Sequence, residues 1–244
     1  APTWPGVVAD YLATGFNIFQ GTWLGSGGPS QLELIVIDWF RQWIGYPQSG
    51  GGLFTSGGSA AILDALVAAR EHHGAPERPA VFMSDQSHSA LERAARIIGV
   101  RPDGIIKVAS DELFRIQISG LERAVSEARS RGYTPIAVCA NAGATNTGAI
   151  DPLPEMAAFC AREKIWLHVD AAYGGFAMLC ERGKALLEGM QLADSISLDA
   201  HKWLFQPFEA GCVMVRDVAK LEQAFSVHPE YLQDTRLGME QVNF

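Results

Sequence analysis

Two ionisable residues of the chain stand at the ends of apolar segments. Asp170 follows the mostly apolar run 166–169, and Lys202 comes 32 residues later, between two further apolar stretches. A lysine amine can condense with an aldehyde, and a buried carboxylate can keep a heteroaromatic ring nitrogen protonated, so that the ring withdraws electrons. Burial of Lys202 would lower the pKa of its amine and favour the neutral nucleophile. The pair predicts pyridoxal phosphate as the cofactor.

Each of the two residues also has a structural interpretation. An isolated Asp at a strand end is typical of a turn former or a helix cap. A Lys that follows a His is usually a solvated surface residue. The chemical interpretation is favoured here because three further segments supply what such a cofactor needs.

The first of these segments, residues 53–61, joins a glycine pair to the start of a helical pattern. Gly57 and Gly58 let the backbone approach an anion, and the free N–H groups of a helix start favour a phosphate. Ser59 adds a hydroxyl donor. A simple helix cap would use the same residues. No Lys follows the glycines, so the segment is not a Walker motif.

The second and third segments follow predicted strands. His88 comes just after the apolar run 80–83. At the carboxyl end of a parallel strand, its imidazole would reach the ligand crevice and could stack on a flat ring, although a capping or core histidine is the alternative. The loop 141–148, which contains Thr145, is rich in small and hydroxyl residues. Such a loop suits contact with a ligand.

Apolar runs and helical patterns alternate along the chain, as in parallel-sheet proteins. Helices are expected at 30–44, 58–73, 87–98, 119–130, 154–162 and 217–225, and strands at 79–83, 104–108, 135–139, 165–169, 194–198 and 211–215. Ser30 and Glu33 predict a capping box for the first helix. The alternation predicts an α/β fold with a mostly parallel, doubly wound sheet and a site at the carboxyl ends of its strands.

Composition restricts the partners of the chain. With 244 residues, 48% of them hydrophobic, it can bury the core of one α/β domain. The net charge of −8 argues against nucleic acid and against acidic membranes. No apolar run could span a bilayer, and the start lacks the pattern of a signal peptide. The cysteines lack metal-ligand spacing, so no metal is expected, and they predict reduced, buried thiols in a cytoplasmic protein.

Taken together, the motifs resemble those of the group II pyridoxal phosphate-dependent amino acid decarboxylases. That family includes aromatic-L-amino-acid, tryptophan, tyrosine and glutamate decarboxylases. The resemblance rests on segments that occur in the family's order over almost the whole chain: Thr55–Ala61, Ser87–His88, Gly143–Thr145, His168–Gly174 and Asp199–Trp203. It implies the large domain of a fold type I enzyme.

The resemblance also implies roles around the cofactor ring. Lys202 would be the Schiff-base lysine, and Asp170 would partner the pyridinium nitrogen. His88 would stack over the ring, with Ala172 as the small residue beneath it. Thr145 would lie beside the ring substituents.

A second group of residues is assigned to the phosphate by the same resemblance. Gly58 and Ser59 resemble the family's phosphate-binding loop, and His201 would be a further donor. Asp199 stands where animal members carry Asn. Because a carboxylate cannot donate to a phosphate as an amide does, Asp199 is expected to act by orienting His201.

The family's overall length suggests that this chain is a fragment. Members begin with a helical segment and end with a smaller domain, whereas residues 1–244 resemble the large cofactor-binding domain alone. In aromatic members a tyrosine of the catalytic loop protonates the carbanion, and members with phenylalanine there tend toward oxidative deamination. Phe244 stands close to that place and Tyr231 near the start of the loop. Decarboxylation to the amine and carbon dioxide is favoured, with aldehyde synthesis as the alternative.

The substrate is expected to be an aromatic L-amino acid, tryptophan or tyrosine. Trp4, Phe19 and Trp23 could form an apolar wall of the side-chain pocket, and the small Gly21 would leave room for an indole. Core packing would use the same aromatic residues.

Two other functional classes stay open at this point. A transaminase or carbon–sulfur lyase would share the Asp and the Lys, but not the context of residues 87–88 and 201–203. A fragment could also be a cofactor-binding or dimerisation scaffold without turnover. The resemblance further implies a homodimer with its sites at the interface.

Overall fold

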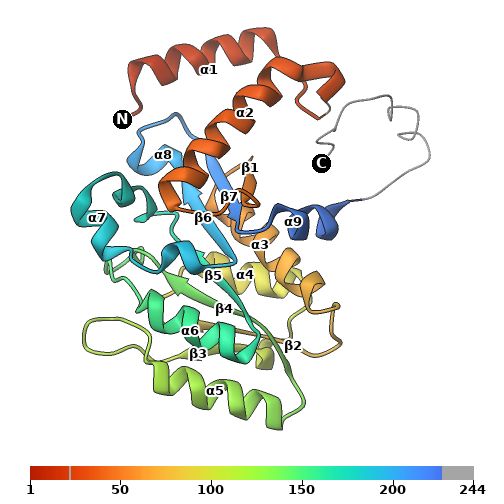
Figure 1. Cartoon of the computed structure of the whole chain (residues 1–244), viewed down its shortest axis with the longest axis vertical. Helices are drawn as coiled ribbons and strands as arrows, with labels where there is room; N and C mark the ends of the chain where they lie inside the picture. The colour runs from red at the N-terminus through yellow and green to blue at the C-terminus, as the bar shows by residue number, and fades with distance from the viewer. Residues whose placement is uncertain (22, 227–244) are drawn as a thin grey trace.

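The computed structural model of the chain describes residues 1–21 and 23–226, with the side chains of residues 23 and 24 excepted. Its centre is a seven-stranded sheet in the order β1-β7-β6-β5-β4-β2-β3 (Figure 1). The strands are β1 Gly51–Thr55, β2 Pro79–Ser84, β3 Ile105–Val108, β4 Thr134–Asn141, β5 Trp166–Asp170, β6 Ser195–Asp199 and β7 Gly211–Val215. Strand β7 runs antiparallel to both β1 and β6, and the other pairs are parallel. The predicted mostly parallel sheet is confirmed.

Helices cover both faces of this sheet. The helices are α1 Trp4–Phe16, α2 Trp23–Ile44, α3 Gly58–His72, α4 Ser89–Ile97, α5 Ile118–Ser130, α6 Leu153–Glu163, α7 Glu181–Leu186, α8 Ala200–Trp203 and α9 Val218–Phe225, with 3₁₀ turns at η1 Pro102–Gly104, η2 Gly175–Leu179 and η3 Met190–Leu192. Buried side chains of α3, α4 and α9 form one hydrophobic core, and those of α2, α5 and α6 contribute to another. Two cores on opposite faces of one sheet define the doubly wound arrangement.

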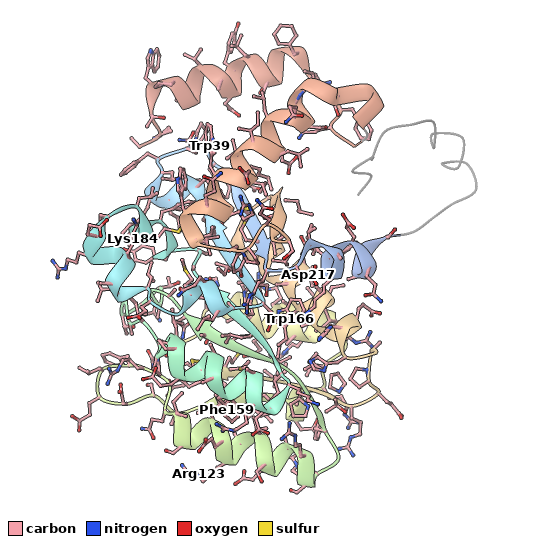
Figure 2. All side chains as sticks on the ribbon, viewed as in Figure 1. Trp39, Arg123, Phe159, Trp166, Lys184 and Asp217 are labelled. Carbon is pink, nitrogen blue, oxygen red and sulfur yellow. The ribbon has the colours of Figure 1, made fainter. Side chains whose placement is uncertain are left out.

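The central strands differ in their patterns. Strand β2 is buried throughout and nearly all apolar, as expected of a parallel strand covered on both faces. Strands β5 and β6 instead place polar or aromatic residues at every second position, which puts 166, 168, 170 and 195, 197, 199 on one face. The register pairs His168 with Ser195 and Asp170 with Ser197. Figure 2 labels Trp166 in the interior near α9, where Lys220 Nζ lies 5.2 Å from the centre of its ring.

The predicted capping box is wrong. Helix α2 begins at Trp23 and kinks at Ser26, where φ is −148° and ψ is 36°, so Ser30 lies inside the helix. Glu33 Oε1 accepts a hydrogen bond from the backbone N–H of Phe54 at 2.8 Å and thereby ties α2 to β1. All the other predicted helices and strands are present with bounds within two residues of those expected.

The cysteines and helix α1 differ in how far they are exposed. Cys139, Cys160 and Cys212 are free and buried as predicted, and burial raises the pKa of each thiol, but Cys180 is exposed at the start of α7. Helix α1 lies at the margin of the molecule (Figure 1). It exposes large apolar side chains. Among the described residues, the helices are all too short or too polar to cross a bilayer.

Candidate functional site

A cavity of about 220 Å³ opens at the carboxyl ends of β4, β5 and β6. It is lined by Ser56, Gly57, Gly58, Ser59, Ile62, His88, Ala90, Asn141, Gly143, Ala144, Thr145, Asp170, Ala172, Tyr173, Asp199, His201, Lys202 and Phe208. All ten residues that the sequence assigns to the site are among them. The structure thus brings residues from six separate segments together, while their individual roles stay predictions.

Asp170 ends β5 with its carboxylate turned into this cavity. Its Oδ1 accepts hydrogen bonds from the backbone N–H of Ala172 at 3.2 Å and from the hydroxyl of Ser197 at 3.1 Å. Burial raises the pKa of the carboxyl group, and these two donors, together with Lys202 and His88, oppose the rise. The Oδ2 atom makes no hydrogen bond with any residue of the described ranges, so it can accept one from a ligand.

Lys202 lies on the short helix α8, which follows β6 directly. Its Nζ lies 2.9 Å from Asp199 Oδ2, and the Asp199 side chain is only 4% exposed. The Lys202 side chain is 35% exposed, so the burial expected from its apolar flanks is wrong: the amine reaches the open cavity and has an ionic partner there. His201 Nδ1 accepts the backbone N–H of Ala210 at 3.0 Å, which fixes its ring at the same edge.

The start of α3 forms a tight cradle. Gly57 has φ +130°, which favours glycine, and no side chain caps the helix after it. A Cβ atom at Gly211 would overlap the backbone of Gly57. Strand β7 and this turn can approach closely because neither Gly211 nor Gly57 has a side chain. A Cβ atom at Gly58 would lie 3.0 Å from Ala172 Cβ. An uncapped helix start in such a turn is a favourable place for a phosphate.

His88 and Thr145 border the cavity from two loops. His88 is the N-cap of α4, and its Nδ1 accepts the backbone N–H of Ala90 at 3.2 Å. The capping role that the sequence left open is therefore present, and His88 also lines the cavity. Thr145 is exposed on the loop between β4 and α6. Both side chains are accessible to a ligand in the cavity.

Comparison with known proteins identifies the family. The family described as "Pyridoxal-dependent decarboxylase conserved domain" matches residues 1–243. The chain belongs to this family. Pyridoxal phosphate is accordingly its cofactor, as predicted from the presence of Asp170 and Lys202 in the sequence.

Individual members of the pyridoxal-dependent decarboxylase family agree with this assignment. The "Aromatic-L-amino-acid decarboxylase" of Bacillus atrophaeus is 44% identical over 98% of the chain and 50% of the relative. The "Phenylacetaldehyde synthase" of Arabidopsis thaliana is 33% identical over 94% of the chain and 50% of the relative. Among solved structures, "Oryza sativa TDC with PLP and tryptamine" has a TM-score of 0.90 at 31% identity, over 98% of this chain and 53% of that one. The chain spans about half the length of these proteins.

The residues present fit pyridoxal phosphate. The uncapped start of α3 offers N–H donors for the phosphate, and Ala172, next to Gly58, has only a methyl group as its side chain at the cavity. Asp170 has an oxygen available to a protonated ring nitrogen, and Lys202 supplies an accessible amine for the aldehyde. The cavity thus has a group suited to each reactive part of the cofactor.

The sequence did not predict Asp151, a buried residue that supports a loop of the site. The carboxylate of Asp151 is buried and accepts the backbone N–H groups of Ile116 at 2.6 Å and Asn141 at 2.7 Å, as well as the Asn141 side-chain amide at 3.0 Å. Burial raises the pKa of Asp151, and these donors oppose the rise. The carboxylate anchors the ends of the loop that carries Thr145. A polar residue next to an apolar helix start was the available signal.

The expected apolar wall is not formed by the described residues. Trp4 is 77% exposed and Phe19 is 74% exposed, and neither lines the cavity. Gly21 lies against the Phe19 ring, where a Cβ atom would overlap it, and it does not line the cavity. The side chain of Trp23, like Tyr231 and Phe244, falls outside the described residues.

Proposed function

We propose that residues 1–244 are the cofactor-binding large domain of a decarboxylase that converts an aromatic L-amino acid, tryptophan or tyrosine, to its amine and carbon dioxide. The observation that carries this proposal is the meeting of Lys202, Asp170 and the uncapped start of α3 in one cavity. Membership of the family and the names of its relatives support the reaction.

The bound cofactor supplies a ring that takes up the electron pair left when carbon dioxide departs. The protein residues make this possible by position and charge. Asp170 keeps the proton on the ring nitrogen, because an ionised carboxylate with a free oxygen beside that nitrogen favours its charged form. The N–H groups at the start of α3 and the Ser59 hydroxyl hold the phosphate. Lys202 provides the nucleophilic amine.

Aromatic side chains at the cavity edge support an aromatic substrate. Tyr173 lines the cavity and packs edge-on against Trp203, with ring centroids 5.6 Å apart. Phe208 lines it as well and packs edge-on against His201 at 4.8 Å. Rings in such positions offer apolar surface to an indole or phenol.

Aldehyde synthesis is the second candidate, favoured by the relative from Arabidopsis thaliana named phenylacetaldehyde synthase. It would follow decarboxylation with a two-electron oxidation of the amine by dioxygen and hydrolysis by water, which release the aldehyde, ammonia and hydrogen peroxide. A cofactor-binding scaffold without turnover is the third, because the chain spans about half of its relatives.

The test supplies the protein and pyridoxal phosphate with tryptophan, tyrosine or glutamate, and measures carbon dioxide, amine, aldehyde and ammonia. We expect carbon dioxide and amine in equal amounts from an aromatic substrate. Aldehyde with ammonia would indicate the synthase, and cofactor absorbance without any product would indicate the scaffold. Lys202→Ala should abolish turnover, while Lys184→Ala, which changes an exposed lysine of α7, should leave it unchanged.

We also propose a homodimer and a cytoplasmic location. The apolar side chains that α1 exposes support the dimer, since Trp4, Tyr11 and Phe16 are each more than 70% exposed. The four free cysteines support a reducing compartment. Sedimentation velocity of the wild type and of Tyr11→Glu should separate dimer from monomer.

A further inference from the structure

Asp199 differs from Asp170 in how its oxygens are satisfied. Its Oδ2 pairs with Lys202 Nζ at 2.9 Å. Its Oδ1 is buried and has no hydrogen-bond partner within residues 1–21 and 23–226. A buried carboxylate oxygen without a donor is costly, since desolvation is not repaid. A side chain kept in this state at a cavity points to a role in binding or chemistry.

The same carboxylate borders the phosphate cradle. A Cβ atom at Gly58 would lie 3.0 Å from Asp199 Oδ2 and 3.2 Å from Oδ1. Gly58 is the first residue of α3, whose N–H groups favour an anion. A phosphate bound there would lie close to a negative charge if Asp199 stayed ionised, and like charges at short range repel.

We propose, on the basis of the cofactor site described above, that Asp199 takes a proton from Lys202 as the cofactor enters. An N–H bond of the Lys202 ammonium breaks, its electron pair stays on Nζ, and an O–H bond forms on Oδ2. The free amine can then attack the aldehyde carbon of the cofactor, with release of water. The neutral acid no longer repels the phosphate. One proton transfer thus prepares the nucleophile and the phosphate cradle together.

The other ionisable groups around Asp199 are less suited to this role. His201 Nε2 lies farther away, 3.6 Å from Asp199 Oδ2, and its Nδ1 already accepts the N–H of Ala210. Asp170 holds two donors on one oxygen and its other oxygen is needed for the ring nitrogen. The Cys212 thiol lies across the strand pair, and burial raises its pKa, so it stays neutral.

The first experiment compares pyridoxal phosphate with pyridoxal, which has the aldehyde but lacks the phosphate. Asp199→Asn keeps the shape of the side chain and cannot take up the proton. With pyridoxal, the visible band of the lysine-linked cofactor should form about a hundredfold more slowly in this variant than in the wild type. With pyridoxal phosphate the slowing should be smaller, because the variant no longer repels the phosphate. Asp10→Asn, an exposed change of equal charge, should behave as wild type.

The second experiment measures binding of inorganic phosphate to the cofactor-free protein by calorimetry. Asp199→Asn should bind phosphate about tenfold more tightly than the wild type. This corresponds to a change of roughly 1.4 kcal/mol in the binding free energy. Lys202→Ala should bind it more weakly, since it leaves the Asp199 charge without a partner. Tighter binding in both variants would show that Asp199 is not the source of the repulsion and would overturn the proposal.

Equal rates of the wild type and Asp199→Asn with pyridoxal would overturn the proton-transfer role. The band forms before any amino acid is added. Normal band formation in the wild type and slow formation in Asp199→Asn, without release of carbon dioxide by the wild type, would therefore contradict the proposed reaction and support the role of Asp199.

Discussion

Strands β5 and β6 carry polar groups along one shared face, but the two halves of that face differ. In the amino half, the Ser195 hydroxyl accepts Trp166 Nε1–H at 2.7 Å and shares a hydrogen bond with His168 Nδ1 at 2.9 Å. In the carboxyl half, the Ser197 hydroxyl donates to Asp170 at 3.1 Å. The first serine is enclosed by fully buried partners, whereas the second supports a carboxylate that faces the cavity. Identical residues two positions apart thus serve the core and the site respectively.

The histidine of the amino half illustrates the cost of a closed interior. The direction of the hydrogen bond between Ser195 and His168 Nδ1 depends on the ring tautomer, and the other ring nitrogen is Nε2. That atom is buried without a partner among the described residues. Burial lowers the pKa of His168 to about 3, so the ring is neutral at any ordinary pH. The amino half therefore holds a structural group, not one for proton transfer.

Asp170→Asn should cause the largest loss of activity, and only the function of the carboxyl half should be affected. Without the carboxylate the ring nitrogen loses its partner, so amine formation should fall by about a hundredfold or more. Stability should not fall at neutral pH. Because burial raises the pKa of Asp170, the native state favours the protonated form, and the ionised form costs free energy above that pKa. Amine assays with urea unfolding test both statements, and a large loss of stability would contradict the separation of the halves.

Ser195→Ala, in the amino half, should lower stability and leave the site intact. It leaves the Trp166 indole N–H without its acceptor and His168 Nδ1 without its hydrogen-bond partner, so the free energy of unfolding should fall by about 2 kcal/mol. Cofactor affinity should stay as in the wild type. Urea denaturation and cofactor titration measure the two quantities, and an equal loss in both would mean that the network also supports the site.

Ser197→Ala is the matched change in the carboxyl half. It removes one donor to Asp170, and hydrogen bonds to charged groups are worth about 1.5–3 kcal/mol, so turnover should fall by about tenfold or somewhat more. Stability should change less than for Ser195→Ala, because one side-chain hydrogen bond is lost instead of two. The same two assays apply. Reversed rankings of the two serine variants would break the comparison.

The pH dependence of stability gives the smallest and most specific test. His168 is neutral in the native state until about pH 3, while an unfolded histidine titrates near 6.5. Between these values the unfolded state binds more protons, so stability falls as the pH falls, by about 1 kcal/mol from about pH 6 to about pH 5. His168→Gln should lose this slope. The wild-type-minus-variant difference is the quantity to measure, because Asp64, whose pKa burial raises to about 6, titrates in both proteins.

The sequence predicted what depends on local pattern. Strand β2 is a short apolar run, and α3 has an apolar helical pattern. The bounds of both were predicted correctly because neighbouring residues alone show which side chains are buried. The site residues could be assigned because their motifs resemble those of a known family and because parallel strands bring their carboxyl ends together. Their convergence on one cavity follows from that topology and needs no knowledge of side-chain contacts.

What the sequence could not predict depends on contacts between distant segments. The ties of Ser195 to His168 and of Asp151 to Ile116 link residues 27 and 35 positions apart. Helix α1 was missed because its apolar residues are exposed and show no buried stripe. The exposure of Lys202 was missed because apolar neighbours in sequence do not show which way a side chain points, and here it points to the cavity.

The most direct test of the account is the nitrogen-15 NMR spectrum of ring-labelled pyridoxal phosphate bound to the wild type and to Asp170→Asn. We expect a protonated ring nitrogen in the wild type and an unprotonated one in the variant, because the Asp170 carboxylate stabilises the protonated form. Ser195→Ala should match the wild type. An unprotonated nitrogen in the wild type, or no difference between wild type and Asp170→Asn, would contradict the role given to the carboxyl half.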